Sequence, residues 1–114
     1  MNDIQENSPT TVGADAGQTL RRLRLSFVGE VQAVGFRWTA REQARSVGAT
    51  GWVRNEDDGS VSMELQGTDE QIALYFGRFN RAYAWHPIDY IIAEKEDIPV
   101  LEDEHDFTVR LSQW

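Results

Sequence analysis

One stretch of the chain combines the residue types that bind an anion. From Phe27 to Arg37 it reads Phe-Val-Gly-Glu-Val-Gln-Ala-Val-Gly-Phe-Arg, with glycines at positions 29 and 35. The pattern indicates a strand, a tight loop and the first turn of a helix, and such a loop leaves main-chain N–H groups without partners. Those donors, the positive end of the helix dipole and the always-charged fork of Arg37 form an anion site. We therefore expect this loop to hold a phosphoryl group.

A second polar position lies at Asn55, which ends the segment Ala-Thr-Gly-Trp-Val-Arg-Asn over residues 49–55. The Glu-Asp-Asp-Gly sequence that follows is typical of a hairpin turn, where an asparagine most often serves the turn itself. The neighbouring Arg54 either adds positive potential near the anion or points to solvent, and both interpretations stay open.

Periodic hydrophobic residues predict the elements that position these side chains. Alternation over residues 22–27 predicts a strand with one buried face. A helical period over residues 36–47 predicts an amphipathic helix of about three turns, and Gly48 follows it as a C-terminal cap. A two-stranded hairpin is expected next, over residues 49–67.

A second helix follows the hairpin. Thr68 and Gln71 have the spacing of a capping box, and a broad hydrophobic stripe continues to Tyr83. We expect a strand at residues 88–92 and a short terminal strand at residues 107–111.

An acidic, irregular segment is expected between those two strands, over residues 94–106. The order β-α-β-β-α-β with a terminal strand predicts an α+β fold, the ferredoxin-like split βαβ sandwich. This fold has an antiparallel sheet with two helices on one face.

Length and composition bound the class of protein. With 114 residues, 40% of them hydrophobic, the chain can bury one core. We place that domain at residues 20–114 and expect a disordered polar leader over residues 1–19. The formal net charge of −8 argues against nucleic-acid binding, and no stretch has the length of a membrane span.

The absence of cysteine excludes disulfides, thiolate metal sites and a thiol nucleophile. The acidic runs at residues 56–58 and 102–106 have no recognised metal-ligand spacing, so we interpret them as a solvated hairpin tip and a charged loop. We expect a monomeric, cytoplasmic protein with no nucleic-acid or membrane partner.

Two motifs together resemble the acylphosphatase family. The stretch ending at Arg37 is similar to the signature Gly-x-Val-Gln-Gly-Val-x-Phe-Arg. The segment Gly-Trp-Val-Arg-Asn-x-x-x-Gly-x-Val over residues 51–61, with Gly67 six residues further on, is similar to the second signature. The resemblance is strong over residues 22–66 and looser toward the C-terminus.

The resemblance implies hydrolysis of a carboxyl–phosphate anhydride, a small-molecule acyl phosphate, to a carboxylate and inorganic phosphate, with no metal and no cofactor. It implies that Arg37 and the loop amides bind the phosphate, and that Asn55 orients the attacking water. The amides concerned belong to Gln32, Ala33, Val34, Gly35 and Phe36. Phosphoryl transfer has a loose transition state, so positioning and charge stabilisation can suffice without a strong base.

The chain departs from the family pattern at Ala33, where the signature has glycine. If that position requires a positive φ, alanine costs on the order of 1 kcal/mol or shifts the loop. The alternative function is therefore a non-catalytic acylphosphatase-like module that keeps a weak anion pocket. A further alternative is a detached domain of a carbamoyl-transfer maturation enzyme, which the missing zinc-binding cysteines disfavour. Another is an RNA-recognition-like binder, which the acidic net charge disfavours.

Overall fold

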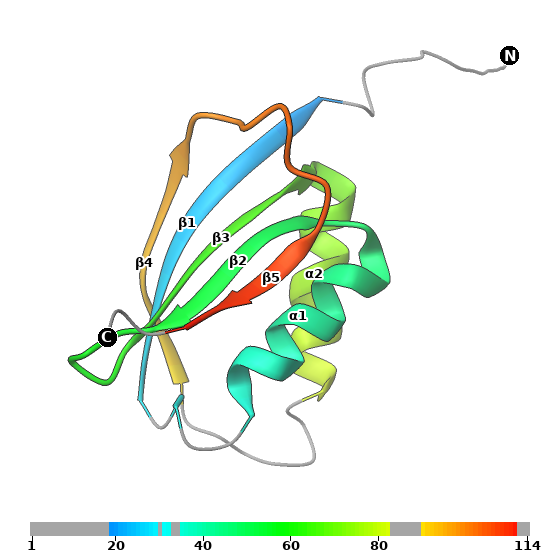
Figure 1. The fold of residues 1–114 in the computed structure, drawn as a ribbon. Coiled ribbons are helices and arrows are strands. Elements are labelled where there is room, and N and C mark those ends of the chain that lie inside the picture. The colour runs from blue at the N-terminus through cyan, green and yellow to red at the C-terminus, as the bar shows by residue number, and fades with distance from the viewer. Residues whose placement is uncertain (1–18, 30, 33–34, 83–89, 112–114) are drawn as a thin grey trace, which may run out of the picture.

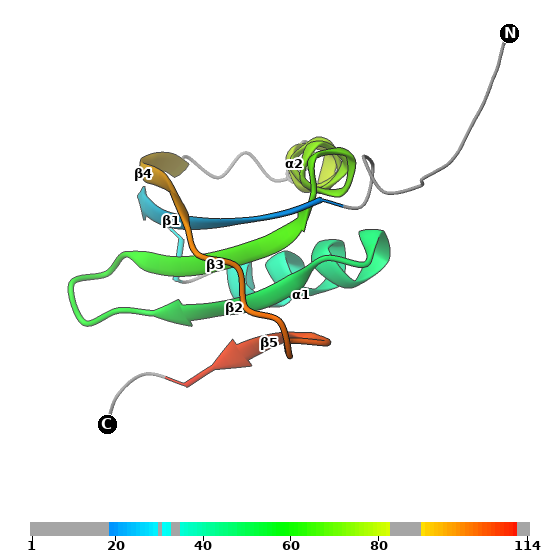
Figure 2. The same ribbon diagram turned by 90° about the horizontal axis from the view of Figure 1, so that it is seen from above.

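The computed structural model of the chain describes residues 19–29, 31–32, 35–82 and 90–111, so the predicted leader lies almost wholly outside the described residues. The elements are β1 (Leu20–Gly29), α1 (Phe36–Val47), β2 (Thr50–Asn55), β3 (Val61–Thr68), α2 (Asp69–Ala82), β4 (Tyr90–Ile98) and β5 (Phe107–Arg110). The sheet order is β4-β1-β3-β2-β5, and both helices lie on one side of the sheet (Figures 1 and 2). The predicted ferredoxin-like α+β fold is confirmed.

The first four strands pair as expected and the fifth adds a parallel edge. β1 pairs antiparallel with both β3 and β4, and β2 pairs antiparallel with β3. β5 pairs in parallel with β2, which places Phe107 opposite Gly51 and Val109 opposite Val53. The five-stranded sheet is therefore mixed, and β5 forms its edge next to β2.

The prediction of irregular structure from residue 94 onward is wrong for residues 94–98. β4 continues to Ile98, with Glu94 opposite Ser26 and Ile98 opposite Arg22 on β1. An edge strand needs only main-chain pairing on one side, and charged side chains are common on such edges because they discourage further pairing. Residues 99–106 are irregular, as expected.

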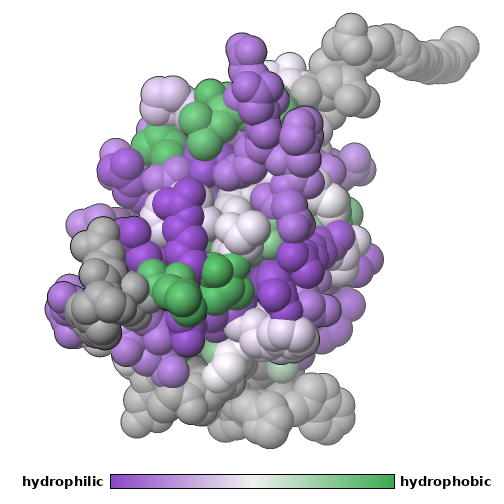
Figure 3. All heavy atoms as spheres, in the orientation of Figure 1, coloured by the Kyte–Doolittle hydropathy of each residue, from purple (hydrophilic) through white to green (hydrophobic). Residues whose placement is uncertain are grey.

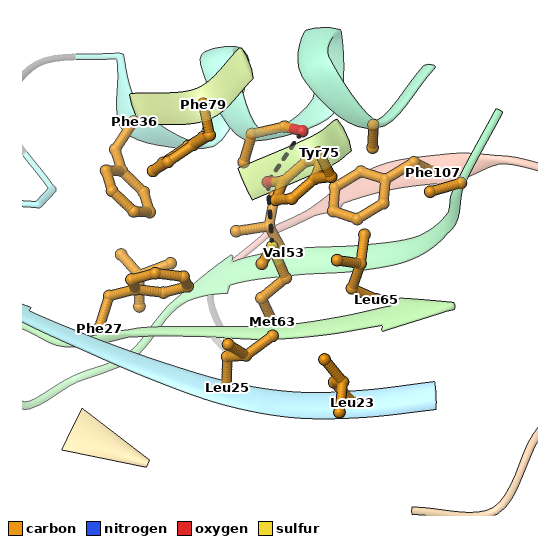
Figure 4. Packing of buried hydrophobic residues seen from close by; sticks show 14 of the residues in the cluster. Leu23, Leu25, Phe27, Phe36, Val53, Met63, Leu65, Tyr75, Phe79 and Phe107 are labelled. Carbon is orange, nitrogen blue, oxygen red and sulfur yellow. Dashed lines mark hydrogen bonds between the residues drawn. The ribbon is translucent and has the colours of Figure 1, made fainter. Parts of the chain in front are cut away.

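Aromatic packing fixes the start of α1 against the end of β1. The core lies between the sheet and the helices (Figure 4), and it contains the predicted buried faces of β1 and β3. The rings of Phe27 and Phe36 meet edge to face with centroids 5.0 Å apart, and Phe36 meets Phe79 of α2 at 5.1 Å. Since Phe36 is the first residue of α1, this contact sets the position of its neighbour Arg37.

Glycines and a capping box mark the helix termini at the positions that the sequence predicts. Gly35 precedes α1 with φ of 73° and Gly48 follows it with φ of 79°, both left-handed conformations that favour glycine. The predicted capping box is present, because the Gln71 amide N–H donates to Thr68 Oγ1 at 3.1 Å and the Thr68 amide N–H donates to Gln71 Oε1 at 2.9 Å.

A buried arginine on the open face of the sheet was not anticipated. Arg22 is 1% exposed and donates to Glu64 Oε1 at 2.8 Å and to Glu104 Oε1 at 2.7 Å. Burial lowers the pKa of Arg22, but its hydrogen bonds to Glu104 and Glu64 hold the pKa above its ordinary value. The ion pair of Glu104 with Arg22 thus holds the irregular segment 99–106 against the open face of the sheet.

The surface seen in Figure 3 is mostly hydrophilic, and its hydrophobic side chains form small separate groups. Within the described residues, no helix combines the length and the hydropathy that a membrane crossing requires.

Candidate functional site

The strand–helix loop and the β2–β3 hairpin meet at one end of the sheet (Figure 1). The side chain of Gln32 joins them, because its Nε2 donates to the main-chain oxygens of Glu56 and Ser60, each at 2.8 Å. The hairpin is therefore held beside the start of α1, and the two segments predicted to form the site are adjacent.

A pocket of about 270 Å³ opens beside the first turns of α1. Its walls come from the loop before α1, from the exposed side of the helix and from β5. The lining residues are Gln32, Gly35, Phe36, Arg37, Trp38, Arg41 and Val109. Four of the predicted phosphate-binding residues thus share one pocket, whereas Trp38, Arg41 and Val109 were not predicted to belong to it.

Arg37 is half-buried in this pocket. No carboxylate of the described residues forms an ion pair with it, although several of the other arginines of the chain have such partners. A guanidinium in this situation keeps its donors available for a ligand. The pocket therefore has a locally positive end in a chain whose net charge is −8.

Asn55 lies beside the pocket, not in its lining. It ends β2 two residues after Val53, which is fully buried in the core, so strand alternation turns both side chains toward the helix layer. Val53 is also the register partner of the pocket residue Val109. Asn55 is thus about 7 Å along the strand from the β5 wall of the pocket, and its Oδ1 atom is buried.

The structure decides between the two interpretations of Arg54. Its Nε donates to Glu56 Oε2 at 3.0 Å, and its guanidinium lies 5.1 Å from the ring centroid of Trp52. Alternation along β2 places these side chains on the open face of the sheet, opposite Asn55. Arg54 is therefore paired with a carboxylate and turned away from the pocket.

Part of the predicted anion loop lies outside the described residues. Ala33 and Val34 belong to this part, and their amide positions stay a prediction. On the helical side of the gap, Gly35 has its positive φ and its carbonyl accepts the amide N–H of Thr39 at 3.0 Å, which begins the α1 hydrogen-bond ladder.

A larger concavity of about 480 Å³ lies on the open face between β1 and the hairpin tip. Its acidic lining includes Asp58, which accepts hydrogen bonds from the amide of Ser60 at 2.9 Å and from its hydroxyl at 2.6 Å. These bonds lower the pKa of the Asp58 carboxyl. The described part of the chain contains no cluster of three or more His, Cys, Asp or Glu side chains placed to hold a metal ion.

The fold and the pocket define a small α+β domain with an arginine-lined pocket at a strand–helix junction. The acylphosphatase family model matches residues 23–109. An acylphosphatase of Rhizobium etli is 42% identical over 80 residues, which cover 68% of this chain and 85% of the relative. An acylphosphatase of Thiobacillus denitrificans is 36% identical over 89 residues, covering 78% and 92%.

A solved structure leads to the same family. The crystal structure of acylphosphatase from Bacillus subtilis superposes with a TM-score of 0.66 at 26% identity, covering 81% of this chain and 99% of that one. The chain belongs to the acylphosphatase family. It is accordingly a hydrolase of acyl phosphates, as its two sequence motifs predicted.

Proposed function

We propose that this protein hydrolyses a small acyl phosphate whose phosphoryl group is bound by Arg37 and by the main-chain amides of the loop before α1. These amides belong to Gln32, Ala33, Val34, Gly35 and Phe36. Asn55 orients the attacking water through its side-chain amide. Neither a metal ion nor a cofactor takes part in the proposed mechanism.

The observation that carries the proposal is the position of Arg37 in the pocket at the N-terminus of α1. Its guanidinium has no acidic partner among the described residues, and the helix dipole adds positive potential at the same place. The two Gln32 hydrogen bonds support the role of Asn55, because they hold the hairpin that carries Asn55 beside that pocket.

The chemistry demands little more than this arrangement. Water attacks phosphorus, the bond between phosphorus and the bridging oxygen breaks, and the carboxylate leaves with the bonding electron pair. Water supplies the new phosphate oxygen, and its two protons remain with the dihydrogen phosphate formed from a dianionic phosphoryl group. A carboxylate is a good leaving group, so a general acid is not required. Arg37 and the amides stabilise the charge on the transferring group, and Asn55 limits the orientations of the nucleophile.

Phosphate release from acetyl phosphate in the presence of EDTA tests this proposal. We expect turnover by the wild type, and a loss on the order of 10²-fold or more in kcat/KM for Arg37→Ala together with the loss of inhibition by inorganic phosphate. Arg78→Ala removes the same charge from the exposed side of α2 and serves as the control. Unchanged phosphate inhibition in Arg37→Ala, or activity that requires a metal, would contradict the proposal.

A further inference from the structure

The pocket beside α1 contains a second guanidinium. Arg41 follows Arg37 by four residues, and both line the same pocket. Residues four apart lie on one face of a helix with Cβ atoms about 5–6 Å apart. The pocket thus has a phosphate end at Arg37 and a second cationic end one helical turn further along α1.

Arg41 is held in place, and within the described residues it forms no close, hydrogen-bonded carboxylate pair. Its guanidinium carbon lies 4.0 Å from the ring centroid of Trp38, an arrangement that orients a cation over an aromatic face. Its Nε is buried and has no hydrogen-bond partner among the described residues. Its one ion pair in the described part of the chain, to Glu42 Oε2 at 3.7 Å, is long and joins adjacent residues.

Arg45, the next arginine along α1, forms a close ion pair with a carboxylate and so serves as a comparison for Arg41. Arg45 Nε and Nη2 donate to the two carboxylate oxygens of Asp106 at 3.1 and 2.9 Å. The hydrogen bond from Arg45 is the largest influence that lowers the pKa of the Asp106 carboxyl, and the nearby positive charge of Arg41 contributes less. The Arg45 pair also joins α1 to the start of β5. Arg41 lines the pocket together with Trp38 and the β5 residue Val109.

We propose that Arg41 determines specificity by binding a second anionic group, a carboxylate at the far end of the acyl chain. The inference rests on the proposed function, which places the phosphoryl group at Arg37. The substrate class is then an acyl phosphate of a short dicarboxylic acid. Its phosphoryl group and its free carboxylate are bridged by a few carbon atoms, which suits two guanidinium groups on successive helical turns.

The lining between the two arginines suits such a molecule. The Trp38 ring and the Val109 side chain offer apolar contact to the methylene groups, while the Arg41 side chain in the same lining offers a guanidinium to the carboxylate. A neutral acyl chain of equal length gains the apolar contact but leaves the cation without a partner. Since the chain as a whole is acidic, this local pair of cations also selects the orientation in which a substrate with an anionic group at each end enters.

The test compares succinyl phosphate with butyryl phosphate, which has a methyl group in place of the terminal carboxylate. We expect the wild type to prefer succinyl phosphate in kcat/KM, and Arg41→Met to reduce that preference about tenfold, chiefly through KM for succinyl phosphate. Arg41→Lys restores part of the preference, since it keeps the charge but not the planar fork. Arg78→Met on α2 is the control for net charge and leaves the preference unchanged.

The outcomes separate the two proposals. Equal losses for both substrates in Arg41→Met, or an unchanged preference, would overturn the role of Arg41 while leaving acyl phosphate hydrolysis standing. A wild type that releases phosphate from neither substrate would overturn the proposed function and this inference with it.

Discussion

The side-chain amide of Gln32 donates a hydrogen bond of 2.8 Å to the main-chain oxygen of Glu56, the residue directly after Asn55. The same NH₂ group donates to the Ser60 oxygen at 2.8 Å, on the other side of the hairpin turn. Both acceptors are carbonyls, so only a donor fits at this position. One side chain therefore couples the proposed phosphate loop to the hairpin that presents the proposed water-orienting residue.

Gln32→Met keeps the length of the side chain but removes both hydrogen bonds to the hairpin. We expect kcat/KM for acetyl phosphate to fall by about 10- to 100-fold, because a displaced hairpin misplaces the water. The free energy of unfolding should fall by roughly 1–2 kcal/mol. Steady-state kinetics and urea unfolding measure the two effects, with Gln43→Met as the control in the same helix layer. Full activity in Gln32→Met would show that the hydrogen bonds do not position the site.

Gly51→Ala tests why β2 has a glycine in its buried stretch. Gly51 has φ of 139°, and an added Cβ would collide with the main-chain oxygen of Glu64 on the paired strand. We expect a loss of about 3 kcal/mol or more in the free energy of unfolding.

Gly59→Ala is the matched control for Gly51→Ala. Gly59 has φ of 91°, but apart from its chain neighbours no atom of the described residues lies within 4 Å of the position of an added Cβ. Backbone strain alone should therefore cost about 1 kcal/mol. Equal losses in the two variants, measured by urea unfolding, would show that the collision with Glu64 is relieved at little cost.

The pair between Arg45 and Asp106 gives stability a specific pH dependence. The hydrogen bond from Arg45, with that from the Phe107 amide, lowers the pKa of the Asp106 carboxyl. A lowered folded-state pKa means that the stabilisation is present above the ordinary carboxyl pKa near 4 and is lost as pH falls through the folded value. Asp106→Asn should therefore lose less stability than the wild type between pH 7 and pH 3.

Urea unfolding at pH 7 and at pH 3 measures that dependence. Asp103→Asn, in the same segment, is the control because Asp103 forms no ion pair within the described part of the chain. An identical pH response in wild type and Asp106→Asn would exclude a role for this pair in acid stability.

Elements with local signals could be predicted from the sequence. α1 runs from Phe36 to Val47 as its hydrophobic period indicates, and Gly48 ends it. The capping box of Thr68 begins α2 in the same way. These features depend on residues within one or two turns of each other, so they can be predicted from the local sequence.

Some features that depend on distant partners were not predicted. The acidic end of β4 is a strand only because β1 provides a free edge for it, and β5 is parallel only because it docks against β2. Likewise Arg22 is buried by Glu104, which is 82 residues away, and no alternation of hydrophobic residues reveals such a pair.

The candidate site was predictable in part. The two motifs identified Gln32, Arg37 and Asn55, and the structure places the first two in one pocket with the third beside it. The spacing of Arg37 and Arg41 was visible in the sequence, but only the structure shows that both line one pocket. Val109 could not be assigned, because its place in the wall follows from the parallel docking of β5. The amides of Ala33 and Val34 stay a prediction.

The proposed water-orienting role of Asn55 is tested most directly by the kinetic analysis of Asn55→Ala with inorganic phosphate as inhibitor. Gln43→Ala, on α1 but outside the pocket lining, is the control. If Asn55 orients the water, kcat for acetyl phosphate falls on the order of 10²-fold or more, while the inhibition constant of phosphate stays within about threefold of the wild-type value. Equal losses in turnover and phosphate affinity, or no loss in either, would contradict the account.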